Sequence, residues 1–260
     1  MQTLTSSDIA KYIEEYAPLS LQEEWDNCGW QLTNGDAIVS GVMLCVDITE
    51  SVIHEAIEKD CNFILSHHPL IFDGLKKITD EPISRCVRTA IEHNIALYSP
   101  HTNIDKVFNG VSAGMCKKLK LNNCKILESD CTNSGFGMIG TLNKPISCTD
   151  FLKQLQYTFN PICLRHSQIT DMAIKTVAVC GGSGSFLISR AKELCADIFV
   201  TADLKYHDFF KADERFILAD IGHFESEQYT KEIFFEILSK KMPTFAILNS
   251  EKEHNPIYCL

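Results

Sequence analysis

The sequence lacks the cysteine spacing, the long apolar runs and the positive charge that several protein classes require. Twelve cysteines are present, but no two have the C-x-x-C spacing of zinc and redox motifs. No apolar run approaches the roughly 20 residues that cross a bilayer, and the amino terminus lacks the pattern of a signal peptide. Lys and Arg total 24 against 34 Asp and Glu. The resulting net charge of -10 disfavours general binding to nucleic acid or to anionic membranes.

The composition is that of an ordinary globular protein. The chain has 260 residues, 45% of them hydrophobic and 22% charged. This length predicts one large α/β unit or two domains, and the composition excludes disorder and fibrous repeats. Several cysteines, among them Cys45, Cys180 and Cys195, lie within apolar runs, which predicts core positions in a reducing compartment. We therefore expect a cytoplasmic protein.

Short β-branched runs alternate with helical stretches along the chain. The amino terminus predicts a helix capped by Thr5 or Ser6. Two later regions repeat one order of strand, helix and strand, namely 41–48, 51–60 and 62–68, and again 174–182, 186–195 and 197–203. This alternation is typical of parallel strands joined by crossover helices and predicts an α/β fold.

Two alignments of the chain with itself indicate an internal duplication. A shift of 135 positions places Val42 on Val177, and a shift of 122 places His101 on His223. Any two strand-helix-strand units resemble one another at this level, but here both shifts occur in the same order. We therefore predict two similar α/β domains. Their expected limits are 1–124 with 220–260 for the first domain and 125–219 for the second.

A histidine pair ends one predicted strand. His67 and His68 close an apolar run and are followed by Pro69. Open α/β sheets bind their ligands at strand carboxyl ends. Neighbours in a regular strand point to opposite faces, but at a strand end that breaks into a proline loop both can turn toward one cleft and serve different ions. The pair therefore indicates two metals, with a pair of surface histidines as the alternative.

Two further segments supply an imidazole and a carboxylate after a predicted buried strand. His101 precedes Asp105 by four positions, and His223 precedes Glu227 by four. Imidazole and carboxylate ligands suit zinc, iron or manganese, and the lack of cysteine ligands argues against a closed structural zinc site. Three such segments at strand ends together predict a dinuclear metal centre.

The order of these motifs resembles a known family, the GTP cyclohydrolase 1 type 2 homologues, or interacting-factor-three-like proteins, which have a dinuclear metal centre. The resemblance is carried by EEWDNCGW (23–30), LSHHPLIF (65–72), SPHTNID (99–105), CGGSGSFL (180–187), TADLKYHDFF (201–210) and GHFESE (222–227). It implies a toroidal homohexamer of two-domain α/β subunits, with two divalent metals in the cleft between the domains. Long family members carry an inserted domain between the halves, for which this chain has no room.

The resemblance also implies a set of metal ligands. By position, His68 and Asp105 bind one ion, His67 and His223 bind the other, and Glu227 bridges the two. Five side chains cannot saturate two ions, so positions remain for water or substrate, as in catalytic sites. Paired ions activate water, and hydrolysis is therefore the expected chemistry.

Other polar residues near these motifs are candidates for catalysis or substrate binding. His101 is a candidate acid–base catalyst, with a role in orienting a ligand as the alternative. Asp26 and Asn27 are candidates for substrate binding or for a simple turn. Lys205 and His207 follow the strand that corresponds to the one ending in the histidine pair, and they are further candidates for substrate binding.

Three other features qualify the resemblance. The segment GGSGS (181–185) lacks the G-K-[ST] of a phosphate loop, so a tight turn is favoured there over an anion cradle. Trp30 stands where the family usually has an aliphatic residue. Ala202 and Asp203 occupy the positions that correspond to the histidine pair, so the second half has no such pair.

Three functions fit these observations. The first is a metal-dependent hydrolase of GTP or a related nucleotide, the second is a metal-dependent phosphoesterase, and the third is a non-enzymatic hexamer that binds a partner or stores metal. The substrate in the first rests on family analogy, because the sequence has no guanine-reading motif or triphosphate loop.

Overall fold

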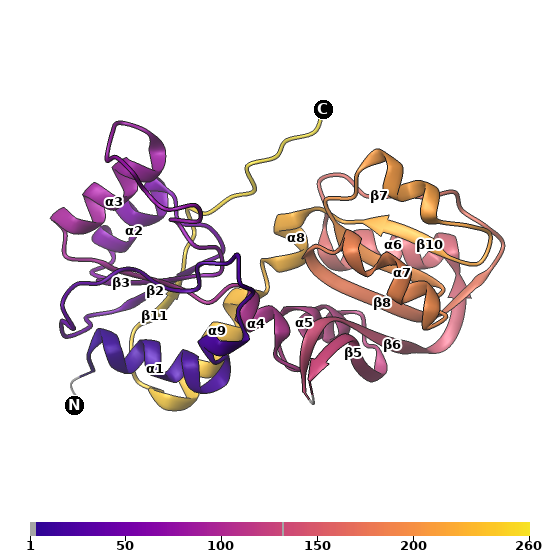
Figure 1. Cartoon of the computed structure of the whole chain (residues 1–260), viewed down its shortest axis with the longest axis horizontal. Coiled ribbons are helices and arrows are strands. Elements are labelled where there is room, and N and C mark those ends of the chain that lie inside the picture. Colours follow the sequence, from indigo (N-terminus) through magenta and orange to yellow (C-terminus); the bar gives the residue numbers. More distant parts are fainter. Residues whose placement is uncertain (1–3, 132) are drawn as a thin grey trace. The chain divides into compact units, whose positions relative to one another are not determined.

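The chain forms two compact units in the computed structural model, which describes residues 4–131 and 133–260 (Figure 1). Unit 1 comprises Met1–Ile104 and Thr230–His254, and unit 2 comprises Asp105–Tyr229 and Asn255–Leu260. Each unit contains one sheet and packs helices against it. The predicted α/β class is confirmed.

Unit 1 is built on a five-stranded sheet. Its elements are α1 (Ser6–Tyr16), the 3-10 helix η1 (Leu19–Leu21), β1 (Gly29–Leu32), β2 (Val42–Cys45), α2 (Glu50–Glu58), β3 (Phe63–Ser66), α3 (Pro82–Glu92), β4 (Ala96–Ser99), α4 (Thr102–Lys106), which runs into unit 2, α9 (Thr230–Lys241) and β11 (Ile247–Asn249). The strand order is β1-β4-β3-β2-β11, parallel except for β1 at the edge. Helix α1 begins at the predicted cap, because the Thr5 hydroxyl accepts from the Asp8 amide and the Asp8 carboxylate accepts from the Thr5 amide.

Both faces of the unit 1 sheet are covered. Every residue of β2, β3 and β4 is buried, as parallel strands between two helical layers require. Met43, Ile64 and Leu97 pack with α2 and α3 on one face, while α9 packs on β2 and against α1 on the other (Figure 1). The parallel strands bring the carboxyl ends of β3 and β4 to one edge of the sheet.

Unit 2 is built on a six-stranded mixed sheet. Its elements are α5 (Val111–Lys118), β5 (Asn122–Cys131), β6 (Ser134–Ser147), α6 (Cys148–Phe159), β7 (Arg165–His166), β8 (Ala173–Ser183), η2 (Ser185–Leu187), α7 (Ile188–Glu193), β9 (Ile198–Ala202), η3 (Tyr206–Lys211), β10 (Ile217–Asp220) and α8 (His223–Glu227). The strand order is β5-β6-β8-β9-β10-β7, with β8, β9 and β10 parallel.

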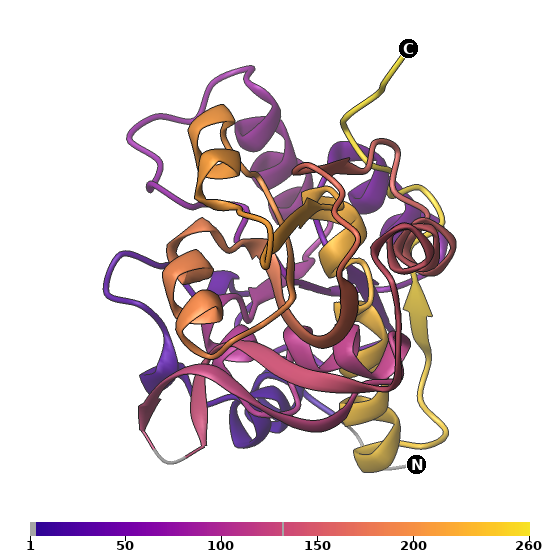
Figure 2. The ribbon, with the colours of Figure 1, turned by 90° about the vertical axis from the view of Figure 1, so that its right-hand side faces the viewer.

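Alternate residues of β8 face different helical layers. Val177 and Val179 pack in a cluster with α5 and α6, whereas Ala178 and Cys180 pack in a cluster with α7. This alternation follows from the two-residue period of a strand. Figure 2 shows α6 (dark rose) and α7 (orange) on opposite sides of the unit 2 sheet.

The strand pairing within each unit confirms the internal duplication. Val42 pairs with Phe63 in unit 1, and Val177 pairs with Ile198 in unit 2, so the 135-residue shift superimposes both strands in register. Each unit then adds a third parallel strand and an antiparallel edge strand. His101 follows β4, and His223 follows the corresponding β10.

The second shift needs a correction of one residue. Phe63 pairs with Ala96, and the corresponding Ile198 pairs with Ile217, which gives a shift of 121 rather than 122. The additional residue lies between β10 and α8, where Ile221 and Gly222 precede His223, and Gly222 has a φ of 85°. Glycine adopts this conformation without steric cost.

The boundaries of the compact units differ from the predicted domain limits. The units change after residue 104 and after residue 229 rather than after 124 and 219. Helix α5 packs on β6 and β8, and α8 packs on β8 and β9, so both helices cluster with the unit 2 sheet. Assignment of independently folding domains stays a prediction.

Burial of the cysteines follows the sequence expectation only in part. Six of the eleven cysteines described are buried, including Cys45 and Cys180. Cys195 is exposed and has a φ of 55° in the turn after α7. The core position expected for Cys195 was therefore wrong, because the apolar run that contains it ends in a turn rather than in a strand or helix.

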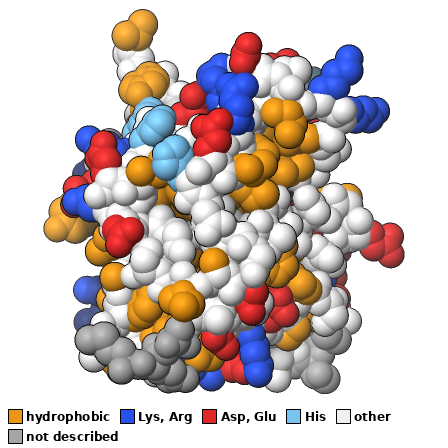
Figure 3. Space-filling view, turned by 90° about the vertical axis from the view of Figure 1, so that its left-hand side faces the viewer, with side chains coloured by type: hydrophobic (Ala, Val, Ile, Leu, Met, Phe, Trp, Pro, Cys, Tyr) orange, Lys and Arg blue, Asp and Glu red, His pale blue; other side chains and the backbone are white. Residues whose placement is uncertain are grey.

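The surface shows both signs of charge. On the face of unit 1 in Figure 3, Lys and Arg side chains lie interspersed with Asp and Glu. Within the described ranges, none of the helices is both long and apolar enough to cross a membrane.

Candidate metal centre

Three histidines lie together at the carboxyl ends of β3 and β4 in unit 1. His67 and His68 follow β3, and His101 follows β4. One ring nitrogen of each lies within 4.8 Å of the others, and the ring centroids are 4.9 to 5.4 Å apart. His67 is fully buried. Both members of the pair turn toward one place, as their position at a strand end allows, and His101 lies beside them.

A carboxylate orients the His68 ring. Its Nδ1 lies 2.8 Å from Asp47 Oδ1, so Nε2 is the nitrogen directed away from this contact. The backbone of Asp47 is fixed in turn, because its amide donates to Glu253 Oε1 at 2.9 Å. The Glu253 carboxylate also pairs with Lys231 and accepts from the Val46 amide.

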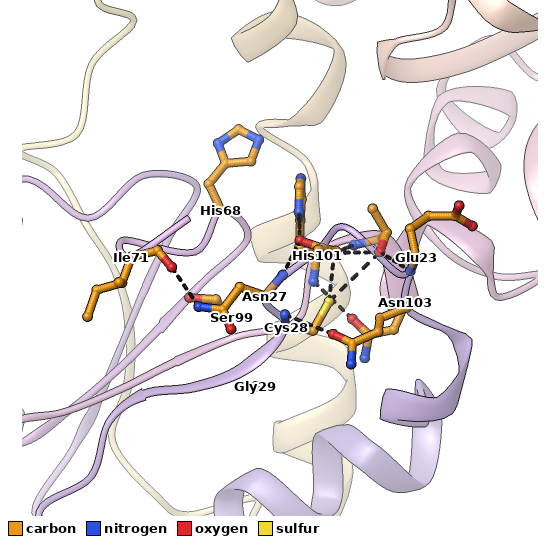
Figure 4. A network of polar contacts seen from close by, with 12 residues as sticks. Glu23, Asn27, Cys28, Gly29, His68, Ile71, Ser99, His101 and Asn103 are labelled. Carbon is orange, nitrogen blue, oxygen red and sulfur yellow. Dashed lines mark hydrogen bonds and ion pairs between the residues drawn. The ribbon is translucent and has the colours of Figure 1, made fainter. Parts of the chain in front are cut away.

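His101 is held by a denser network around the buried carboxylate of Asp26. Its Nδ1 lies 2.8 Å from Asp26 Oδ1, while Asp26 Oδ2 accepts from the amide and hydroxyl of Thr102 and from the Cys28 thiol. Burial by itself raises the pKa of Asp26, but the hydrogen bonds from His101, Cys28 and Thr102 outweigh it and hold this pKa well below its usual range. Figure 4 shows these contacts converging between Cys28 and His101.

Unit 2 repeats this arrangement at the carboxyl ends of β9 and β10. His223 Nδ1 lies 2.7 Å from Asp203 Oδ2, and its Nε2 lies 2.9 Å from Glu227 Oε2 one turn later on α8. Ser183 donates to the same Asp203 oxygen at 2.6 Å. Burial lowers the pKa of His223, but the neighbouring Glu227 and Asp203 carboxylates more than offset this and raise it to about 11.

The glycine-rich segment allows β8 to pass close to Glu227. Gly182 has a φ of 61°, and a Cβ there would lie 2.3 Å from Glu227 Oε1. Its backbone is fixed on both sides, because its amide donates to the Ser226 hydroxyl and its carbonyl accepts from the Thr201 hydroxyl, both at 2.9 Å. The segment 181–185 therefore serves close packing around a carboxylate, and its first three residues continue β8 instead of forming the tight turn favoured from the sequence.

Asp105 lies on α4, and its carboxylate, like that of Glu227, affects the pKa of the Cys180 thiol. Burial is the main cause of the raised pKa of Cys180, and the negative charges of Asp105 and Glu227 add to it. Both carboxylates therefore approach the end of β8 within unit 2.

The remaining candidate residues lie outside these groups. Asn27 is exposed, and its side-chain amide donates to the Ile71 carbonyl at 2.6 Å. Lys205 and His207 are exposed at η3, where the His207 ring packs on Tyr206 at 5.2 Å. Their role in substrate binding stays a prediction.

Sequence reasoning missed two carboxylates and the main contact of a third. Asp47 and Asp203 each orient a histidine, and Asp26, expected at a substrate or a turn, also holds one. Asp47 and Asp203 follow the carboxyl ends of parallel strands. That position was the available indication, because ligand sites collect there.

The donor chemistry of both groups fits divalent metal ions. Histidines that bind metals almost always give their second ring nitrogen to a carboxylate, a carbonyl or water, which fixes the tautomer. His68, His101 and His223 each have Nδ1 against an aspartate. Nitrogen and oxygen donors without cysteine sulfur suit zinc, iron or manganese. The described residues therefore contain groups compatible with metal binding.

Comparisons with known proteins agree over nearly the whole chain. A model of the Duf34/NIF3 (NGG1p interacting factor 3) family matches residues 4–256. A GTP cyclohydrolase 1 type 2 homolog of Clostridium acetobutylicum is 33% identical over 230 residues, 86% of each chain. One of Campylobacter jejuni is 33% identical over 248 residues, 95% of this chain and 96% of the relative.

Solved structures show the same fold. The crystal structure of Staphylococcus aureus hypothetical protein SA1388 matches with a TM-score of 0.91 and 26% identity over the full length of both chains. Reduced HcgD from Methanocaldococcus jannaschii matches with a TM-score of 0.81 and 26% identity over 96% of this chain and 99% of that one. On the family model and on these relatives, the chain belongs to the Duf34/NIF3 family.

Proposed function

We propose that this protein holds two divalent metal ions and hydrolyses GTP or a related nucleotide. His68 and Asp105 would bind one ion, His67 and His223 the other, and Glu227 would bridge them. The observation that carries the proposal is the repeated pairing of a histidine Nδ1 with an aspartate in both units, which is typical of metal-ligating histidines. The names of the relatives support the nucleotide.

The chain's own residues would position the reacting groups. Two divalent ions, when bound, supply activated water for hydrolysis. Asp47 keeps a proton on Nδ1 of His68 and leaves its Nε2 for a metal, whereas Nε2 of His223 contacts Glu227, a contact that a bound ion would replace. Asp26 likewise keeps a proton on Nδ1 of His101, so the Nε2 of His101 is able to accept a proton from a reacting group. His101 is therefore the proposed acid–base residue.

Product analysis on metal-loaded protein tests the reaction. Formate release from GTP is the expected result, because one water adds to the guanine imidazole ring and opens it to a formamide, and a second water hydrolyses this formamide to formate and a free amine. Phosphate release would instead favour the phosphoesterase. If neither product forms while both ions are bound, the non-enzymatic role as a binding or storage protein replaces the hydrolase. The homohexamer that the resemblance implies remains part of the proposal, and its mass in solution is measurable by light scattering.

His101→Ala is expected to keep both ions and lose most of the turnover. Positioned acid–base groups contribute roughly 10²- to 10⁴-fold in rate, so the loss should lie in that range. Metal content and turnover are to be measured on the same preparation. Asp26→Asn should reduce turnover in the same direction, because it removes the carboxylate that fixes the His101 tautomer. Loss of metal together with activity would make His101 a ligand instead.

A further inference from the structure

Two exposed aromatic side chains border the histidine cluster of unit 1. Trp25 is 61% exposed and Phe72 is 44% exposed. Their ring centroids are 6.1 Å apart, and each lies within 6.4 Å of the His101 ring. The planes of Trp25 and Phe72 are tilted by 55°, and both meet His101 nearly edge-on. Large apolar rings that remain exposed beside a polar site indicate a binding surface.

The backbone on either side of these rings is fixed. Trp25 occupies a turn closed by the hydrogen bond from the Asp26 amide to the Glu23 carbonyl, and the Glu23 amide donates to the Thr102 hydroxyl at 3.0 Å. Ile71, which precedes Phe72, makes two backbone hydrogen bonds: its carbonyl accepts from Asn27 and its amide donates to Gln31.

These bonds join the segment that follows Trp25 to the loop that carries Phe72. They measure 2.6 Å for Asn27 Nδ2 to the Ile71 carbonyl and 3.0 Å for the Ile71 amide to Gln31 Oε1. Gln31 Nε2 also donates to the Asn27 carbonyl at 2.7 Å. The loop that carries Trp25 and the loop that carries Phe72 therefore form one hydrogen-bonded unit. A surface prepared in this way loses little conformational freedom when a ligand binds.

We infer that Trp25 and Phe72 bind the planar heteroaromatic ring of a small molecule whose polar end reaches the histidine cluster. Aromatic faces stack on flat π-systems and tolerate any substituent pattern at the ring edge. This inference specifies the substrate class of the proposed hydrolase. It rests on the proposed function only where it places the polar end of the ligand at the histidine cluster.

Intrinsic fluorescence offers a direct test. The chain has two tryptophans, Trp25 and Trp30, so Trp30→Phe leaves Trp25 as the sole indole reporter. Titration of this variant with guanosine monophosphate is expected to quench the emission in a saturable manner. Ribose 5-phosphate, which has the polar end without the ring, should not quench it. Equal responses to the two compounds would overturn the inference.

Calorimetry with variants separates stacking from other contacts. Trp25→Leu and Phe72→Ala are each expected to weaken guanosine monophosphate binding about 5- to 150-fold, the range that base–aromatic stacking supplies. Tyr157→Ala removes a 91% exposed aromatic residue on α6 and should leave the affinity unchanged. Unchanged affinity in both unit 1 variants would also overturn the inference, provided that their circular dichroism and melting match the parent.

The same titrations distinguish failure of this inference from failure of the proposed function. Stacking should persist after chelation of divalent metals, with a lower overall affinity. If binding depends on the ring but the metal-loaded protein releases neither formate nor phosphate, the binding surface is supported and the hydrolase is refuted. If the affinity is the same with and without the ring while hydrolysis is normal, the hydrolase is supported and the aromatic binding surface is refuted.

Discussion

Glu227→Gln is expected to release both metal ions at once, whereas His68→Ala should weaken mainly one. Glu227 is 3% exposed, and its Oε2 lies 2.9 Å from His223 Nε2. Glutamine keeps the volume of the side chain but removes the negative charge that two cations would share. The loss in affinity should exceed the roughly 10- to 100-fold that follows removal of an outer hydrogen-bond partner. Elemental analysis and competition titration measure it.

Helix α8 supplies a matched control for this substitution. Glu225 is also buried, at 5% exposed, but its Oε1 accepts a hydrogen bond from the Ile162 amide at 2.8 Å. Glu225→Gln should therefore alter stability while both ions stay bound. If Glu227→Gln retained one ion and His68→Ala lost both, the bridging role would be refuted.

Gly182→Ala should destabilise unit 2 and displace the Glu227 carboxylate. A side chain at a φ of 61° costs roughly 1–2 kcal/mol, and overpacking adds about 1–3 kcal/mol. The clash is with Glu227 Oε1 at 2.3 Å, and the backbone of Gly182 is held by two hydrogen bonds that prevent its retreat. We expect the free energy of unfolding to fall by about 2–5 kcal/mol and metal affinity to fall with it.

Gly35→Ala is the control that measures backbone strain without a steric clash. Gly35 has a φ of 70°, but a Cβ there would meet nothing within 4 Å. Its substitution should cost only the backbone strain, about 1–2 kcal/mol, and leave metal binding intact. Urea unfolding of the metal-free proteins provides both free energies. Equal losses at the two glycines would show that Glu227 yields to the new methyl group.

The positions of the histidines were predictable because the end of a strand can be recognised from a few neighbouring residues in the sequence. A buried apolar run followed by His67, His68 and a proline marks a strand that stops, and parallel strands bring such ends together. The 135-residue repeat was also visible, because corresponding strands keep one register in each unit. The additional residue between β10 and α8 was not, because a one-residue insertion in a loop leaves the apolar pattern unchanged.

The contacts that orient the histidines depend on the folded chain. Glu253 fixes the Asp47 amide from a distance of 206 residues in sequence, and no spacing rule connects such positions. Asp26 holds His101 across 75 residues. An aspartate in a loop is expected in a turn in any case. The role of Gly182 depends likewise on the packing of α8 against β8.

The discontinuity of unit 1 sets an order for its assembly during translation. Strand β11 pairs with β2, and Glu253 holds the backbone of Asp47, the partner of His68. These late residues leave the ribosome only after the whole segment 105–229 has been synthesised, while domains otherwise fold from the amino terminus first. The nascent chain therefore presents β2, β3 and β4 without their parallel edge strand until Ile247–Asn249 has been synthesised. Until Glu253 has been synthesised, the backbone of Asp47, the partner of His68, lacks this hydrogen bond, so the contact that orients the His68 ring forms only after the segment 105–229 is present.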